Sequence, residues 1–505
     1  MSHFKNFISA CAGAGIFMSL SACATVEDML STERDEPISG ETRSILTLEE
    51  NLVADPRIAE LPVNLPTAYT NSQWPQPGGA PTNAMQHLEL EGELNRVWQR
   101  NAGVGNRSNT RMTASPVLSN GRVFLLDADV QVLAHDAETG ARLWRTSLSR
   151  QGEARRSGFG GGVAVAVDRV IATTGFGDIV ALNVETGEEI WRQGVGVPIR
   201  TAPTVVAGRA FVVTTDSQLL AVDTANGNIL WNQRAFQESA GLLAATSPAA
   251  TNDVVVAPFT SGELDAVRIQ TGSVAWSDQL TRTGNFTPLA NINAIAARPV
   301  IANGRVYAIS HSGRFVAIDL RTGERIWTTN VASTQTPWVA GNFVYVVTVD
   351  AELVCISTRD GRVRWITQMD RWKNENRERG AIQYVGPVLV SERLVVISSE
   401  GRLEQYSPFD GSFLESVRVG DPVSLPPIVA NETLYIYSDD ADLIAFRGER
   451  IAQQGTIVPD VLLSDAPISE DTTTNLIAEP SEESDEDGDD EEGRRGWFRW
   501  PWSSQ

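Results

Sequence analysis

Hydrophobic and polar positions alternate along most of this chain in short runs of four to six residues. Val, Ile and Leu fill the runs, and Gly, Asn and Asp separate them, as in 203–206, 210–213, 219–222 and the run through Ile229 and Trp231. This pattern is typical of β-strands joined by tight hairpins. No helical period of comparable length competes with it in the body of the chain. The sequence therefore predicts an all-β fold built from small antiparallel sheets.

Four such runs form a unit that recurs with a shared turn, in which Thr-Gly is followed by Trp four residues later. The clearest copies are Thr139-Gly140 with Trp144 and Thr322-Gly323 with Trp327. Looser copies pair Gly187 with Trp191, Gly227 with Trp231, Gly272 with Trp276 and Gly361 with Trp365. Glycine supplies the positive φ that a tight turn needs, and the Trp can fill the wedge between neighbouring units. Successive glycines lie 38 to 51 residues apart, a period that predicts a propeller or a solenoid.

The end of the repeat indicates how many units there are. A seventh turn, Asp410-Gly411, carries Glu415 where the Trp should be. The unit after it has three runs and no Thr-Gly turn: 427–430, 434–437 and 443–446. Residues 94–99, which contain Trp98, resemble the missing fourth strand but precede the first unit. Pairing them beside 443–446 would leave no free sheet edge, so we expect an eight-bladed β-propeller over residues 91–450, closed by the N-terminal strand.

The N-terminus has the pattern of an export signal over residues 1–23. Lys5 precedes an apolar stretch too short to span a bilayer, and Leu20-Ser21-Ala22-Cys23 follows. Small residues before a Cys resemble a lipoprotein cleavage site, which would make Cys23 a lipid-bearing N-terminus. The alternative is ordinary cleavage that leaves an incidental Cys. We expect residues 24–90 to be a poorly ordered tether, with 71–76 docked on the propeller flank.

Charge is concentrated at the C-terminal end of the chain. The formal net charge is −22, and ten acidic residues fall within Glu479–Glu492. Residues 451–505 are poor in aliphatic residues, which predicts a disordered tail. Its end, residues 494–502, combines Arg with Trp and Phe and is either a tethered recognition motif or an incidental appendage. No basic stripe suits nucleic acid, so we expect no nucleic-acid partner.

Residues for metal or redox chemistry are few. Cys355 is the one cysteine outside the N-terminal signal and its cleavage site, so it cannot form an internal disulfide. His87, His135 and His311 share no metal-ligand spacing. The run Asp439–Asp442 falls where other units have a hairpin turn, which favours a solvated turn over a metal loop. We expect neither a catalytic site nor a bound cofactor.

Together, the cleavage site at Cys23, the segment Asn71–Gly79 and the eight repeats resemble the BamB family, over Cys23 to about Gly448. These are propeller lipoproteins of the outer-membrane β-barrel assembly machinery. Ala24 after the Cys fits outer-membrane sorting in this resemblance. It implies a non-catalytic periplasmic scaffold, monomeric within a hetero-complex, that binds the POTRA domains of BamA and other subunits. Quinone-dependent dehydrogenases share the blade motif and are the alternative, but this chain lacks the adjacent Cys pair typical of them. A propeller interaction hub is a third interpretation.

The resemblance also implies contact residues, in loops that join neighbouring blades near the middle of the ring. A Leu-x-Leu-Arg segment of the family corresponds to Ala240–Leu243, so Leu242 carries over and Leu243 replaces the Arg. An Asp-x-Asp element corresponds to Asn291 and Asn293, with amides in place of carboxylates. Leu242 and Leu243 either face a partner or pack in a core. Residues 370–379, which lengthen a later connection, are either a charged solvated loop or an interface.

Overall fold

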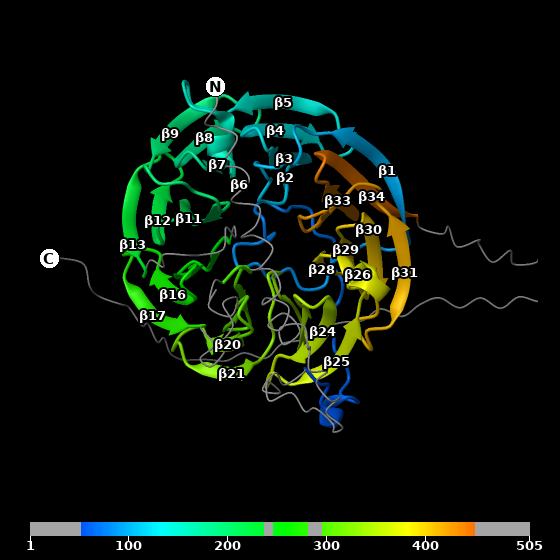
Figure 1. Ribbon diagram of the computed structural model, residues 1–505. Helices are drawn as coiled ribbons and strands as arrows, with labels where there is room; N and C mark the ends of the chain where they lie inside the picture. The colour runs from blue at the N-terminus through cyan, green and yellow to red at the C-terminus, as the bar shows by residue number, and fades with distance from the viewer. Residues whose placement is uncertain (1–51, 237–245, 281–294, 450–505) are drawn as a thin grey trace, which may run out of the picture. The chain divides into compact units, whose positions relative to one another are not determined.

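The computed structural model describes residues 52–236, 246–280 and 295–449. The chain divides into two units, residues 1–451 and 452–505, and all described residues belong to the first. The predicted eight-bladed propeller is confirmed: the described residues form eight four-stranded antiparallel sheets arranged as a ring (Figure 1). Short 3-10 helices are η1 (Pro56–Ile58), η2 (Arg155–Gly158) and η4 (Glu375–Arg377). None of the described helices has the length and apolar character needed to cross a bilayer.

In each blade the first strand is the innermost and the fourth lies on the outer rim (Figure 1). Blade one contains β2 (Val117–Ser119), β3 (Arg122–Leu126), β4 (Gln131–Asp136) and β5 (Arg142–Ser147). Blade two contains β6 (Gly161–Ala166), β7 (Arg169–Thr174), β8 (Asp178–Asn183) and β9 (Glu189–Gly194). Blade three contains β10 (Thr204–Val206), β11 (Arg209–Val213), β12 (Gln218–Asp223) and β13 (Ile229–Arg234). Blade four contains β14 (Ala249–Ala250), β15 (Val254–Pro258), β16 (Glu263–Arg268) and β17 (Val274–Gln279).

The second half of the ring follows the same order. Blade five contains β18 (Val300–Ala302), β19 (Arg305–Ile309), β20 (Phe315–Asp319) and β21 (Arg325–Thr329). Blade six contains β22 (Trp338–Ala340), β23 (Phe343–Val347), β24 (Glu352–Ser357) and β25 (Val363–Gln368). Blade seven contains β28 (Tyr384–Val390), β29 (Arg393–Ser398), β30 (Arg402–Tyr406) and β31 (Phe413–Arg418). Blade eight contains β32 (Ile428–Ala430), β33 (Thr433–Tyr437), β34 (Asp442–Glu449) and β1 (Glu93–Asn101).

The ring closes as the sequence predicts. Strand β1 pairs antiparallel with β34, with Leu94 opposite Gly448 and Gln99 opposite Ile444. The last blade therefore takes its outer strand from the beginning of the propeller, and no outer strand of blade eight is missing. This pairing couples the two ends of the domain, so the blades cannot separate there without breaking a strand ladder.

The Thr-Gly turn and its Trp hold neighbouring blades together. The indole of Trp144 lies on Gly187 of the next blade, where an added Cβ would come within 2.5 Å of Trp144 Cε3. Trp144 Nε1 also donates a hydrogen bond to the Val184 carbonyl at 3.1 Å. The same bond recurs in six seams, at 2.8 to 3.3 Å. Position 187 thus requires glycine for two reasons: its backbone has a positive φ, and a side chain there would collide with the neighbouring indole.

The seam between blades seven and eight explains why Glu415 replaces the Trp. Blade eight has no Thr-Gly turn, because its third strand β34 and its fourth strand β1 come from opposite ends of the domain, so an indole at position 415 would have no such turn to cover. A polar group of side chains fills the space. Arg393 Nη1 donates to the Gly92 carbonyl at 2.8 Å and to Gln405 Oε1 at 2.9 Å, and Gln405 Nε2 donates to Glu415.

The segment that precedes β1 lies in the centre of the ring, where Figure 1 shows it in dark blue. This N-terminal segment (residues 52–92) makes hydrogen-bond contacts at the inner strand, or the turn after it, of every blade. In blade order the pairs are Trp74 with Leu118, Pro75 with Val165, Gln76 with Val205, Pro81 with Ala250, Thr82 with Ile301, Gln86 with Trp338, Leu88 with Leu389, and Asn71 with Asn431.

The prediction of a poorly ordered tether over residues 24–90 is therefore wrong for residues 52–90, and the docking of 71–76 on the flank is wrong as well. The buried side chains of the segment, Trp74, Met85, Leu88 and Leu90, are 0 to 5% exposed. They follow no helical or strand period, since each fills a gap set by a different blade. Local sequence therefore carries no sign of their burial.

The first part of the N-terminal segment, residues 52–64, lies outside blade six, next to β25 (Figure 1). The Asp55 N–H donates to the Val363 carbonyl at 2.8 Å, and Arg364 Nε donates to the Leu61 carbonyl at 3.0 Å. These contacts cover part of an outer strand that would otherwise present free backbone groups.

Candidate functional site

The two ends of the ring differ in what occupies them. At one end, here called the loop end, the fourth strand of each blade connects to the inner strand of the next. The N-terminal segment lies toward the opposite end, because several of its contacts involve the last residues of an inner strand or the turn that follows. Examples are Ala250, Ser391 and Asn431. The loop end is therefore the end that the chain's own N-terminal segment leaves open.

Two long connections leave the loop end on either side of blade four. One joins β13 to β14 and the other joins β17 to β18. Their middle parts, residues 237–245 and 281–294, lie outside the described residues, and with them the predicted contact residues Leu242, Leu243, Asn291 and Asn293. Cys23 also lies outside the described residues. The structure does describe the points at which both connections are fixed to the ring.

The two connections return to the ring side by side. Thr246 Oγ1 donates a hydrogen bond to the Ile295 carbonyl at 3.1 Å, which joins the end of one connection to the end of the other. Ser247 Oγ donates to the Ala202 carbonyl at 2.9 Å. Thr246 and Ser247 are both buried. Blade four thus holds the returning chain to its neighbours on both sides.

The two connections also leave the ring close to one place, the turn between β15 and β16. The Phe236 N–H donates to Glu263 Oε2 at 3.0 Å, and the Leu280 N–H donates to the Gly262 carbonyl at 2.8 Å. The Phe236 side chain is 81% exposed. An exposed aromatic residue at the root of a long loop is typical of an interaction surface. Sequence reasoning missed Phe236, which belongs to no repeat motif.

A buried acid lies beneath this surface. Asp265 of β16 is 2% exposed, and its Oδ1 accepts a hydrogen bond from Ser277 Oγ at 2.5 Å. Burial raises the pKa of Asp265 to about 6, and the neighbouring Glu263 acts in the same direction. Its charge therefore changes in a range close to neutral pH, unlike that of an exposed Asp. It occupies a strand position that is apolar in most other blades, and this was the one sequence signal that could have identified it.

The described residues offer no obvious metal or redox centre. No group of three or more His, Cys, Asp or Glu side chains among them could hold a metal ion. Cys355 is buried in β24, and burial raises the pKa of its thiol. Asp439, Asp440 and Ala441 lie in the turn between β33 and β34, and Asp442 begins β34; Asp439 Oδ1 accepts a hydrogen bond from Ser424 Oγ at 2.5 Å.

The lengthened connection between blades six and seven is an ordered hairpin of β26 (Trp372–Asn374), η4 and β27 (Arg379–Ala381). Ion pairs hold it to both blades: Arg371 to Asp350 at 3.0 Å, Lys373 to Glu400 at 2.5 Å, and Arg402 to Asp370 at 3.1 Å. Its tip, residues 374–381, is exposed. The charges at its base are thus used in holding the hairpin in place.

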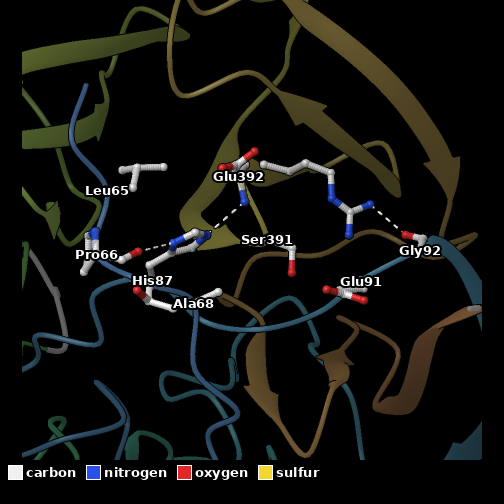
Figure 2. Close-up of a pocket in the computed structure, with 10 residues that line it drawn as sticks. Leu65, Pro66, Ala68, His87, Glu91, Gly92, Ser391 and Glu392 are labelled. Atoms are coloured by element: carbon white, nitrogen blue, oxygen red, sulfur yellow. Dashed lines mark hydrogen bonds between the residues drawn. The ribbon is translucent and has the colours of Figure 1, made fainter. Parts of the chain in front are cut away.

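A pocket of about 530 Å³ lies between the N-terminal segment and the turn after β28, and Figure 2 shows its lining. His87 lies in its wall, where Nδ1 donates to the Pro66 carbonyl at 2.7 Å and Nε2 accepts from the Glu392 N–H at 2.9 Å. These two bonds require a neutral imidazole with its proton on Nδ1. One ring nitrogen therefore joins two parts of the N-terminal segment and the other joins the segment to blade seven, which favours a structural role for this pocket.

Comparison with known proteins agrees with this architecture. The sequence profile of a family described as "Outer membrane protein assembly factor BamB" matches residues 88–158 and 127–367, which together span more than half of the chain. The chain is 28% identical over 363 residues to the protein of that name from Salmonella typhimurium, covering 69% of this chain and 88% of the relative.

Solved structures share the fold. The crystal structure of BamB from Moraxella catarrhalis superposes with a TM-score of 0.58 at 15% identity, over 70% of this chain and all of that one. A quinohemoprotein alcohol dehydrogenase from Comamonas testosteroni superposes with a TM-score of 0.60 at 14% identity, over 75% of this chain and 81% of that one. Identities this low establish a common propeller fold and no shared activity.

Proposed function

Because this chain belongs to the BamB family of outer-membrane protein assembly factors, we propose that it acts as a non-catalytic scaffold whose loop end binds the POTRA domains of BamA. The observation that carries this proposal is that the two long connections beside blade four are hydrogen-bonded to the ring at neighbouring positions, both where they begin and where they end. They leave beside one turn and return through the Thr246–Ile295 hydrogen bond. Two loops fixed at both ends to a rigid ring can present a preorganised contact surface.

The proposal assigns the contact to the predicted residues. Leu242 and Leu243 supply apolar contact from the first connection, and Asn291 and Asn293 supply amide hydrogen bonds from the second. Phe236, at the root of the first connection, extends the apolar surface. Apolar side chains at the centre of a contact, surrounded by polar groups, are the usual arrangement of protein interfaces.

The test is the double replacement Leu242→Asp and Leu243→Asp in the full processed chain. Charges placed in an apolar contact should weaken binding to a purified POTRA array by about thirtyfold or more, equivalent to about 2 kcal/mol. The matched control replaces Leu143 and Leu414, which are both 47% exposed on outer strands, with Asp. Biolayer interferometry should show near-normal binding for the control, with an unchanged circular dichroism spectrum for both. Unfolding of the first double variant would instead indicate that these leucines pack in a core.

We further propose that Cys23 carries the lipid that attaches the scaffold to the outer membrane, supported by Leu20-Ser21-Ala22-Cys23 at the end of the apolar stretch. Replacing Cys23 with Ser should abolish metabolic labelling with a radioactive fatty acid and release the chain from the membrane fraction. Labelling as strong in the variant as in the wild type would exclude Cys23 as the attachment point.

A further inference from the structure

A cavity of about 540 Å³ lies between the β26–β27 hairpin and the outer strands of blade seven. The hairpin and the residue after it contribute Trp372, Lys373 and Ile382, and blade seven contributes Arg402, Ser416 and Arg418. The cavity opens at the loop end, because Arg402 begins β30 and Arg418 ends β31. Ion pairs fix the hairpin to blades six and seven. The walls of this cavity are therefore held in place by the ring.

Two arginines lie directly opposite each other at this cavity. Arg402 of β30 pairs with Arg418 of β31 in the strand register, and both side chains line the cavity. Like charges at directly opposed positions of neighbouring strands destabilise a sheet. Six other blades have at most one charged residue in the corresponding pair: Gln131 with Ser147, Asp178 with Gly194, Gln218 with Arg234, Glu263 with Gln279, Glu352 with Gln368, and Asp442 with Asn101. Blade seven thus brings together two positive charges where these blades do not.

The two arginines differ in how the chain pairs them. Arg402 Nη2 forms ion pairs with Asp370 at 3.1 Å and with Glu404 at 3.4 Å. Arg418 is exposed, and within the part of the chain that the structure describes its guanidinium forms neither a hydrogen bond nor an ion pair. Its charge is therefore free to meet an anion that enters the cavity.

A buried acid holds Arg402 from the interior of blade seven. Glu404 is 5% exposed, and the Tyr406 hydroxyl donates a hydrogen bond to its Oε2 at 2.8 Å. The corresponding strand position is aliphatic in six other blades: Leu133, Val180, Leu220, Val316, Val354 and Ile444. A buried carboxylate costs stability unless it is paired. Here its pairing orients Arg402, whose side chain is still 42% exposed, so little side-chain entropy remains to be lost on binding.

The hairpin side of the cavity has an apolar wall next to these charges. Trp372 is partly exposed and Ile382 is buried, and both line the cavity. Lys373 lies across Gly380, where an added Cβ would come within 3.0 Å of its Cγ, and its Nζ binds Glu400 at 2.5 Å. A ligand would thus meet two arginines on one side and an indole on the other. This combination fits a carboxylate that is carried beside an aromatic or aliphatic group.

We propose that this cavity binds an acidic segment of a second protein, with a carboxylate between Arg402 and Arg418 and a neighbouring aromatic side chain against Trp372. Guanidinium groups bind carboxylates through parallel N–H···O hydrogen bonds, and a carboxylate between the two arginines offsets their mutual repulsion. The inference goes beyond the proposed function and does not depend on it, because none of these residues belongs to the connections beside blade four.

The test measures binding of three probes to the full processed chain by isothermal titration calorimetry. They are the blocked peptide acetyl-Leu-Asp-Phe-Asp-Leu-amide, its counterpart with Asn in place of both Asp, and inorganic phosphate. The variant Arg418→Gln removes the unpaired cation and no contact within the described residues. The matched control is Arg234→Gln, since Arg234 is exposed, ends β13 of blade three and lies opposite Gln218 in the same register. Titrations at about 0.05 and 0.3 M NaCl show how far salt screens the contact.

We expect the wild type to bind the acidic peptide at least about tenfold more tightly than the Asn peptide, and more weakly at the higher salt concentration. Arg418→Gln should weaken binding of the acidic peptide by about tenfold, because a charge-assisted hydrogen bond is lost. Arg234→Gln should bind within about twofold of the wild type. The melting temperature of Arg418→Gln should be unchanged or higher, since a like-charge pair has been removed.

Other outcomes would overturn the inference. Equal binding of the two peptides, or an unchanged affinity in Arg418→Gln, would show that the arginine pair does not bind carboxylates. Phosphate that binds as tightly as the acidic peptide would indicate a general site for small anions. A lower melting temperature for Arg418→Gln would assign that residue a structural role. Normal peptide binding in a chain that fails to bind the POTRA array would count against the proposed function alone.

Discussion

The two ends of the propeller differ in how far their side chains are covered by the rest of the chain. Toward one end, the N-terminal segment meets the inner strands of all eight blades, and its apolar side chains are buried. At the loop end, Phe236 is 81% exposed, and Arg200 Nη1 before blade three and Arg298 Nε before blade five are buried without a hydrogen bond. Buried polar groups in folded proteins are nearly always hydrogen-bonded. Among the described residues such exceptions also occur away from the loop end, at His135 Nε2 near the end of β4 and Arg209 Nε at the start of β11, so they do not by themselves mark one end.

This difference is consistent with the proposed function, in which the loop end is the surface that binds another protein. The N-terminal segment satisfies backbone groups of the inner strands and fills the space between them, so that end contributes to stability. The loop end keeps desolvated charge and exposed aromatic surface, which lower stability and favour association. Folded proteins bury apolar side chains and pair buried polar groups almost everywhere, and they depart from this mainly at functional sites. The departures at the loop end agree with a functional role for that end.

The largest effect that tests the contrast should come from Trp74, which is 3% exposed in the centre of the ring. Replacing it with Ala should lower the free energy of unfolding by about 3 to 5 kcal/mol, because a large cavity opens between the N-terminal segment and blade one. Chemical denaturation gives the measurement. The variant that remains folded should still bind the POTRA array normally, since the loop end lies at the opposite end of the inner strands.

The matched control for Trp74 is Trp372→Ala in the β26–β27 hairpin, where the side chain is only partly buried. Its loss should change the free energy of unfolding by no more than about 1 kcal/mol. Equal destabilisation by the two replacements would show that the N-terminal segment contributes no more than a surface hairpin does.

A smaller effect, of the opposite sign, should come from Asp265 at the loop end. Its pKa in the folded chain is about 6, above the ordinary 3.8, so the folded state binds more protons than the unfolded state between these values. The stability of the wild type therefore falls as the pH rises from about 4 to about 6 through this group. Asp265→Asn should raise the free energy of unfolding at pH 7.5, by at most about 3 kcal/mol, and the gain should vanish near pH 4.

The control for Asp265 is Asp278→Asn in the same blade. Asp278 forms an ion pair with Arg325 at 2.7 Å, so its neutralisation should lower the free energy of unfolding at pH 7.5, by about 1 kcal/mol or less. Thermal denaturation at a series of pH values distinguishes the two variants. Destabilisation by Asp265→Asn at pH 7.5 would show that the buried carboxylate is stabilising and that the contrast between the two ends does not extend to it.

The blade architecture could be predicted because it repeats. Gly140, Gly187 and the later turn glycines are regularly spaced, and most are followed by a Trp four residues later. The sequence repeats in this way because each seam between blades uses the same contact between a turn glycine and an indole. The one blade with Glu415 in place of the Trp is also informative, because the blade that follows it has no Thr-Gly turn. Closure by residues 94–99 was predictable for the same reason, as the last blade lacked a strand that the N-terminus could supply.

The candidate site was predictable only in part. Resemblance to the family pointed to the connections around blade four, and the structure describes their roots but not Leu242, Leu243, Asn291 or Asn293. Asp265 gave only the signal of an acid at a strand position that is apolar in most other blades, and Arg200 and Arg298 gave none. A lone charged residue beside a strand resembles any solvated surface residue until burial and partners are known.

The sequence by itself thus determined the strands, the turns, the number of blades and the closure of the ring, because these follow from periodic, local chemistry. Only the tertiary structure decided that residues 52–92 pack within and around the ring instead of forming a tether, and which buried charges lack partners. Both depend on contacts between residues up to several hundred positions apart, such as Asn71 with Val429 and Trp338 with Gln86. Such contacts have no period, so they arise only when the closed ring brings its eight inner strands together.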